Sequence, residues 1–456
     1  MRHLFVMRHA KAKQPSGDMA DHQRPLRKRG KRQAAAMSPV LQRWQALEGE
    51  VYVSTSARTR ATFDEIAGRL PDRPLANSAH FDEALYTFEG DALMNWLKAL
   101  PEGAERVLII GHNPALVELA RWLDKVSPTK LSTASVLHFT LPQTPWSAME
   151  QGGATLVGSL SPEAASYPLF KRRAPKPPDP KSDMAARTRA MLAHQCWMIK
   201  ALEPGVIAGE DPEFLHQYRV NLRRSRAVGE SLRSVTKVPG LKKQLKALKH
   251  RARATSDLRD LDVFLEDLGN LSPPLSVNTR MDLQQWLQAC RAEQHNAVCQ
   301  LLSAPEYAEQ LQNWQAFIAS GEVKKALSKL TSKRINAVLD KRIAAHDDDL
   351  ALLASDASDA DLHELRKRVK RIRYLADLTP ATSKRFLAQL KHRQRLLGDF
   401  QDICTRQAWL DAFCASLSPD SQQKQECHQW RASLEEPKQK LREEILAFVP
   451  LVNVAS

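Results

Sequence analysis

A proline-rich segment divides the chain into two parts with different sequence patterns. Prolines at positions 168, 175, 177, 178 and 180 disfavour helix and strand, so residues 166–184 are expected to form a stiff, extended linker. Before it, residues 1–165 alternate short apolar runs with amphipathic stretches, which predicts strands alternating with helices. After it, residues 185–456 have long, strongly charged helical patterns and almost no strand signal. We therefore expect an open-sheet α/β domain followed by an all-α domain.

Charge distribution favours a polyanionic partner for the second part. The net charge is +15, and residues 1–165 contribute 20 basic against 17 acidic side chains, so most of the excess lies beyond them. Such an excess favours nucleic acid, an anionic membrane surface or a phosphate polymer. The N-terminal apolar run is too short for a signal peptide, and no stretch is long enough to span a membrane. Six cysteines without metal-type spacing favour a reducing, cytoplasmic location.

Three predicted strand ends in the first part carry basic side chains. The first strand runs into Arg8 and His9, the second is followed by Arg58 at a helix start, and the third by His112. Ligand sites of open α/β sheets form at the carboxyl ends of strands, and the free amides of a helix start attract anions. Guanidinium and imidazolium groups suit phosphoryl oxygens, and a neutral histidine nitrogen can attack phosphorus. The sequence therefore predicts a phosphoryl-transfer site.

The order of these residues resembles the histidine phosphatase superfamily, specifically its small SixA-like phosphohistidine phosphatases, over about residues 1–160. The resemblance implies a phosphoglycerate-mutase-like fold and a nucleophile, His9, that forms a phosphohistidine without a metal or cofactor. The further residues expected to bind the phosphoryl group or substrate are Arg8, Arg58, His112, Arg24 and Asn113. The matching segments are Arg8-His9-Ala10, Asp21-His-Gln-Arg24-Pro25-Leu26 with Gly30, Ser54 to Thr62, and Gly111-His112-Asn113-Pro114.

Two details of this resemblance remain open. The small branch lacks the insertion in which larger relatives carry their catalytic glutamate, so Glu83 and Asp21 are both candidates for the general acid, and either could instead be a solvated loop carboxylate. Thr55 stands where the family usually has proline, and Ala61 where glutamine or glutamate is common.

Two sequence blocks recur in the same order in the second part. The block from His216 to Arg226 returns as His363 to Arg373, and residues 248–253 return as residues 390–395. This indicates a duplicated helical unit, about residues 190–340 and 341–450. In each copy a basic stripe lies beside an apolar stripe of the same helix. Because neighbouring like charges destabilise a helix, their repetition suggests an anion that compensates them.

These blocks resemble the CHAD family, named for histidines in an α-helical domain, over roughly residues 190–450. The resemblance implies a duplicated helical bundle that binds inorganic polyphosphate in a basic groove. Two positions depart from the pattern: Lys370 replaces an arginine, and Thr255-Ser256 replace a Leu-Gly that the second copy keeps as Leu397-Gly398. The residues expected to bind polyphosphate are His216, Arg219, Arg223, Arg224, Arg226, Lys249, Arg253, His363, Arg366, Lys370, Arg371, Arg373, Lys391 and Arg395.

Nucleic acid is the main rival for this basic surface and is disfavoured. Aromatic side chains do not interleave with the basic stripes, so no stacking platform for single strands is expected. The tryptophans of the second part, Trp197, Trp286, Trp314 and Trp430, are expected in the core.

The expected function is a phosphatase acting through a phosphohistidine on a phosphohistidine protein or another phosphomonoester, with polyphosphate bound by the helical domain. The alternatives are a polyphosphate-binding or granule-associated protein with a weakly active phosphatase domain, and a phosphatase of polyphosphate ends. The expected location is cytoplasmic, with polyphosphate granules as one possible site.

Overall fold

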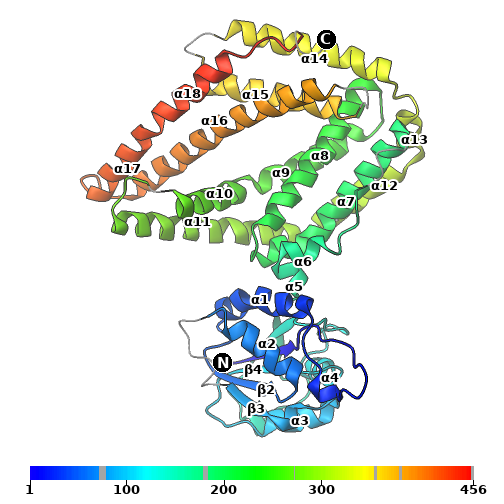
Figure 1. Ribbon diagram of the computed structural model, residues 1–456, viewed down its shortest axis with the longest axis vertical. Coiled ribbons are helices and arrows are strands. Elements are labelled where there is room, and N and C mark those ends of the chain that lie inside the picture. Colours follow the sequence, from blue (N-terminus) through cyan, green and yellow to red (C-terminus); the bar gives the residue numbers. More distant parts are fainter. Residues whose placement is uncertain (71–78, 178–182, 272, 354–356, 379–382, 453–456) are drawn as a thin grey trace. The chain divides into compact units, whose positions relative to one another are not determined.

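The computed structural model describes residues 1–70, 79–177, 183–271, 273–353, 357–378 and 383–452 (Figure 1). The chain forms two compact units. The first comprises Met1–Ala174 and Pro204–Glu213, and the second comprises Pro175–Glu203 and Phe214–Ser456. The first division, between Ala174 and Pro175, falls inside the segment predicted as a linker. No helix among the described residues is long and apolar enough to cross a membrane.

The first unit contains a six-stranded sheet with strand order β3-β2-β4-β1-β5-β6. The first four strands are parallel to one another, and β5 runs antiparallel to both of its neighbours. The apolar runs correctly predicted β1, β2, β4 and β5, whereas β3 and β6 were missed because most of their residues are exposed or only partly buried and form no continuous apolar run. The strands are β1 (Arg2–Arg8), β2 (Glu50–Ser54), β3 (Ala79–Asp82), β4 (Arg106–Gly111), β5 (Val136–Leu141) and β6 (Thr155–Leu160).

Helices cover both faces of this sheet. Leu4 and Val6 of β1 pack with α3 (Gly90–Lys98) and α4 (Ala115–Leu123). The alternate residues Phe5 and Met7 pack with α1 (Lys28–Arg43) and α2 (Ala57–Ala67) on the opposite face. Successive strand residues point to opposite faces, so a continuous apolar run is what a strand covered on both sides requires. The predicted α/β architecture is therefore confirmed.

The prediction of an extended linker is wrong near the start of the segment. A short helix, α5 (Pro162–Ala165), ends just before it, and Tyr167–Lys171 within it form a second short helix, α6. Pro168 lies at the beginning of α6, where its missing N–H group costs no intrahelical hydrogen bond. The proline-rich composition therefore did not exclude a helical turn there. Residues 178–182 of the predicted linker lie outside the described residues.

From Met184 onward, all the regular secondary structure among the described residues is helical, which confirms the all-α prediction. Figure 1 shows α15 and α16 running side by side in the second unit. The helices are α7 (Met184–Ala208), α8 (Glu213–Val235), α9 (Leu241–Ala254), α10 (Ser256–Asn270), α11 (Val277–Ser303), α12 (Pro305–Ala319), α13 (Gly321–Leu327), α14 (Ser332–Leu352), α15 (Asp359–Ala376), α16 (Lys384–Ser416), α17 (Gln422–Ser433) and α18 (Glu435–Leu446).

The two sequence copies occupy corresponding helices. The histidine-containing blocks lie on α8 and α15, and the following basic blocks lie on α9 and α16. The predicted apolar stripes are buried on both helices, as Leu222 and Val369 illustrate at 0% exposure. One difference follows the departure from the family pattern: α9 and α10 are separated at Thr255, whereas α16 continues without a break through Leu397 and Gly398.

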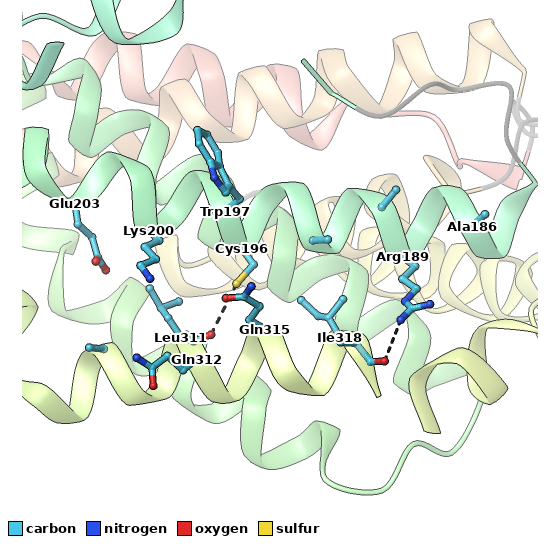
Figure 2. Close-up of a pocket in the computed structure, with 14 residues that line it drawn as sticks. Ala186, Arg189, Cys196, Trp197, Lys200, Glu203, Leu311, Gln312, Gln315 and Ile318 are labelled. Atoms are coloured by element: carbon cyan, nitrogen blue, oxygen red, sulfur yellow. Dashed lines mark hydrogen bonds between the residues drawn. The ribbon is translucent and has the colours of Figure 1, made fainter. Parts of the chain in front are cut away.

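Trp197 on α7 departs from its predicted core position. It is 46% exposed, whereas Trp314 and Trp430 are buried as expected. Figure 2 shows the Trp197 ring pointing away from α12, while the neighbouring Cys196 points toward Leu311 of α12. Because α7 is apolar around most of its circumference, its sequence periodicity does not reveal which side is covered.

Candidate functional site

Strand register brings the two predicted histidines together. Arg8 pairs with Gly111 across β1 and β4, so His9 and His112 leave the sheet side by side, with ring centroids 5.2 Å apart. The helices that follow these two strands, α1 and α4, lie on opposite faces of the sheet. Such a reversal opens a crevice at the carboxyl ends of the strands, where ligand sites form in open α/β sheets.

His9 is held in the form that a nucleophile requires. Its side chain is buried, and its Nδ1 lies 2.8 Å from the carbonyl oxygen of Ala10. A carbonyl only accepts hydrogen bonds, so Nδ1 carries the hydrogen and Nε2 keeps its lone pair. Burial, together with the charges of Arg58 and Arg8, lowers the pKa of His9 to about 3. The ring is therefore neutral at neutral pH.

Arg58 and His112 form a buried pair beside His9. Arg58 is 2% exposed, and its Nη2 lies 3.2 Å from Nδ1 of His112. The guanidinium can only donate, so the hydrogen of a neutral His112 is on Nε2, which lies 2.9 Å from Oγ of Ser54. Burial, with His9 and Arg58 nearby, lowers the pKa of His112 to about 2. A phosphoryl dianion bound here would raise that pKa, because it favours the charged ring.

Asp21 accepts hydrogen bonds from the guanidinium group of Arg58. It begins a short 3₁₀ helix, η1 (Asp21–Gln23), and its Oδ2 accepts from Arg58 Nη2 at 2.8 Å. Arg24 donates to its Oδ1 at 2.7 Å, and the Tyr86 hydroxyl to its Oδ2 at 2.8 Å. Burial raises the pKa of Asp21, but hydrogen bonds from Arg24 and Tyr86 and the charge of Arg58 outweigh it and hold the pKa well below its usual range. At neutral pH this carboxylate has no proton to give.

Glu83 lies at the exposed rim of the same cluster. It begins the short helix η3 (Glu83–Leu85) and accepts a hydrogen bond from the hydroxyl of Thr55. Thr55 is the residue that replaces the usual proline, so this departure supplies the group that holds Glu83. The ring of Tyr86, on the same segment, lies 5.4 Å from that of His112. The choice between Glu83 and Asp21 as the general acid stays a prediction; the donors that hold Asp21 as a carboxylate are the argument for Glu83.

Arg8 and Asn113 point away from the Arg58 cluster. Arg8 Nη1 and Asn113 Nδ2 each donate to the carbonyl oxygen of Leu131 at 2.9 Å. Both line a separate cavity of about 580 Å³. The Nε of Arg8 and Oδ1 of Asn113 are buried without a hydrogen-bond partner. Their predicted contacts with the substrate stay predictions, as does that of Arg24, which is bonded to Asp21.

In the helical unit, the basic stripes of the two copies meet at one cavity of about 410 Å³, which we call the basic groove. Five of its cations belong to the predicted set, from α8, α9 and α15. Across the copies, Nε of Arg223 lies 3.0 Å from the hydroxyl of Tyr374. The residues lining the groove are Arg223, Arg226, Ala227, Glu230, Ser231, Lys249, Arg342, Glu364, Lys367, Lys370, Arg371 and Tyr374.

Lys370 is the most perturbed cation of the groove. Burial, with the charges of Arg366 and Arg223, lowers its pKa to about 7. The side chain of Arg366 makes no hydrogen bond within the described part of the chain, and its Nε is buried. Its counterpart in the first copy, Arg219, instead donates to Thr255 and Ser256, the two residues that replace the usual Leu-Gly. The copies therefore differ: one arginine is bonded within the fold, and the other has unused donors.

The remaining predicted cations lie outside the groove lining. Arg224, Arg253 and Lys391 are exposed. His216 is half-buried on α8, and the other predicted residues, His363, Arg373 and Arg395, bond to Gln401, Gln394 and His392.

Two arginines of the second blocks are buried inside the fold and do not line the groove. Arg251 and Arg393 are 1% exposed and bond to the backbone of Tyr307 and Val449 inside the fold. Conversely, Arg342 was not predicted, because α14 lies outside the repeated blocks.

Comparison with known families identifies both domains. The model of the histidine phosphatase superfamily (branch 1) matches residues 4–108, and that of the CHAD domain matches residues 190–411. The chain contains a domain of the histidine phosphatase superfamily followed by a CHAD domain. Two uncharacterized mycobacterial proteins are similar to part of the chain. One, from Mycobacterium tuberculosis, is 30% identical over 161 residues, 33% of this chain and 97% of its own length. The other, from Mycobacterium leprae, is 31% identical over 117 residues, which are 25% of this chain and 68% of its own length.

Two solved structures resemble the two domains separately. The protein histidine phosphatase SixA complexed with tungstate is 26% identical, with 35% of this chain and 97% of that chain covered and a TM-score of 0.30. The CHAD domain from the plant Ricinus communis is 21% identical, with 61% of this chain and 97% of that chain covered and a TM-score of 0.48.

Two close contacts hold the loop after β1, which carries His9, against α1 and α2. The hydroxyl of Thr62 accepts from the backbone of Ala10 and donates to the carbonyl of Arg58 one turn earlier in α2, so it ties the backbone after His9 to the helix that carries Arg58. On the other side, α1 approaches so closely that a Cβ on Gly30 would overlap the carbonyl oxygen of Lys11. Thr62 lies in the matched segment, but its connecting role was not predicted.

Gly30→Ala should therefore destabilise the phosphatase domain. Overpacking against a backbone carbonyl is expected to cost about 2 kcal/mol and to shift the loop that carries His9. The measurement is the temperature at which the intact chain loses phosphatase activity. Gly103→Ala is the matched control, because an added Cβ there meets nothing within 4 Å. Equal inactivation temperatures for the two variants would contradict this packing argument.

Proposed function

We propose that the phosphatase domain hydrolyses phosphohistidine or another phosphomonoester through a phosphohistidine on His9. The observation that carries the proposal is the buried, neutral His9, whose Nε2 lone pair is free beside Arg58 and His112. Attack of Nε2 on phosphorus forms the N–P bond as the bond to the leaving group breaks. Water then attacks the same phosphorus, which releases inorganic phosphate and restores His9. Arg58 and His112 would exchange their present hydrogen bonds, to Asp21 and to each other, for bonds to the phosphoryl oxygens and so stabilise their charge in both steps.

Glu83 is proposed to protonate the leaving group. Glu83→Gln should lower kcat/KM by about 100-fold or more for phenyl phosphate, whose leaving group needs a proton. The effect should be small for para-nitrophenyl phosphate, which leaves readily as an anion. Glu89→Gln, a change at another exposed carboxylate, serves as the control. Equal losses on both substrates would contradict the role of Glu83 as the acid.

We further propose that the CHAD domain binds inorganic polyphosphate in the basic groove. Support comes from the convergence of cations from both copies in the groove lining and from the lowered pKa of Lys370. A linear polyanion would relieve repulsion among these cations, and its affinity should fall with salt. Duplex DNA that competed as well as polyphosphate at equal phosphate concentration would contradict this assignment.

Polyphosphate binding should weaken as pH rises above 7. A polyanion beside Lys370 favours the charged amine and raises its pKa, so binding takes up a proton once the free protein has lost it. Affinity should drop by up to about tenfold per pH unit between roughly pH 7 and 9. Asp260, whose pKa burial raises to about 6, is already mostly ionised in this range.

Titration of long-chain polyphosphate, which has few terminal groups, would measure this dependence. Lys370→Arg keeps the charge at all these pH values and should bind with little pH dependence. An unchanged pH profile in Lys370→Arg would assign the titration to another group.

A further inference from the structure

A second cation-lined cavity adjoins the basic groove in the CHAD domain. It encloses about 500 Å³ between α8, α14 and α15 and is called here the outer cavity. Five of its side chains are basic and one is acidic. Its lining residues are Glu230, Arg233, Ser234, Val338, Lys341, Arg342, Ala345, Arg368, Arg371 and Ile372.

The two cavities are continuous. Glu230, Arg342 and Arg371 line both of them. Arg342 is half-buried between them, and its Nη1 donates to the carbonyl oxygen of Arg371 at 2.8 Å. This bond fixes a guanidinium at the passage from one cavity to the other while leaving its other donors available.

Most of the charge in the outer cavity is uncompensated. The only acid in its lining, Glu230, lies 3.3 Å from Arg226 of the groove, and Arg368 pairs with Asp349. Within the described part of the chain, Arg233, Lys341 and Arg371 pair with no carboxylate, and all three are exposed. A cluster of this kind attracts a polyanion through its summed field.

We propose that the outer cavity continues the polyphosphate path, so that a chain filling the basic groove passes Arg342 and extends to Arg233 and Lys341. This inference rests on the proposed polyphosphate binding and adds a dependence on chain length. Arg223 and Arg233 are ten residues apart on α8, so the groove and the outer cavity together span about 15 Å along that helix. A short oligophosphate would occupy the groove alone, whereas a long chain would contact both cavities.

The test compares tripolyphosphate with long-chain polyphosphate on the intact protein. Arg233→Ala combined with Lys341→Ala removes two exposed charges of the outer cavity. This variant should bind long chains about tenfold more weakly, and the slope of log affinity against log salt should fall by about two. Its affinity for tripolyphosphate should be unchanged. Lys324→Ala with Lys325→Ala, two exposed lysines of α13 outside both cavities, is the matched control with the same net charge.

Each other outcome overturns the extension. If the outer variant binds long chains like the control, while the groove variant Arg223→Ala with Lys370→Ala binds them weakly, the path ends in the groove. If the outer variant loses equal affinity for both lengths, the two residues act on the groove itself. If the unaltered protein binds neither ligand, the polyphosphate proposal fails together with its extension.

Discussion

Replacing His9 by alanine is expected to reduce phosphatase activity at least about 1,000-fold, because it removes the nucleophile rather than one of several charges. No neighbouring group offers a substitute, since His112 uses Nδ1 to accept from Arg58 and holds Nε2 against Ser54. The measurement is hydrolysis of para-nitrophenyl phosphate and of a phosphohistidine protein without added metal.

Two companion variants make this result interpretable. His9→Gln keeps a polar side chain of similar length and should be as inactive as His9→Ala, which separates loss of chemistry from loss of packing. His80→Ala removes an exposed histidine of β3 and should stay active. Activity of His9→Ala equal to that of the unaltered protein would refute the proposed chemistry.

The second large effect is expected at the basic groove. Arg223→Ala combined with Lys370→Ala should lower the affinity for long-chain polyphosphate by about 100-fold or more, because charged hydrogen bonds contribute about 1.5–3 kcal/mol each. These residues come from different copies, on α8 and α15, and both line the groove. Arg219 is a poorer choice for this test, because its bonds to Thr255 and Ser256 also support the fold.

Binding would be followed by titration at several salt concentrations. The salt dependence should become shallower in the double variant, since fewer phosphates are neutralised. The α13 lysine variant described above provides the control for net charge. An unchanged affinity in the double variant would remove the groove from consideration as the binding site.

Sequence patterns were sufficient for the parts of the fold whose burial is one-sided or complete. Central strands such as β1 and β4 are continuous apolar runs because helices cover both of their faces. The edge strands were missed because their sequences contain no continuous apolar run. The orientation of Trp197 was missed because α7 has no single apolar face in its sequence. Short-range patterns also did not reveal the helical turn at Pro168.

The candidate phosphatase site was predictable where strand ends determine it. His9 and His112 meet because β1 and β4 are neighbours in register. The contact of Asp21 with Arg58 and the turn of Arg8 toward Leu131 depend on loop conformations far apart in the sequence, which local patterns do not specify. Arg342 was missed for a similar reason, because only the packing of α14 brings it to the groove.

Trapping the covalent intermediate tests the central claim most directly. The protein would be mixed with a phosphorylated substrate, quenched within milliseconds in alkali, where phosphohistidine survives, and analysed by mass spectrometry of the peptide containing His9. We expect phosphate on His9 in the unaltered protein and none in His9→Gln. Substrate turnover without a phosphorylated enzyme, or with phosphate on a different residue, would contradict phosphoryl transfer through His9.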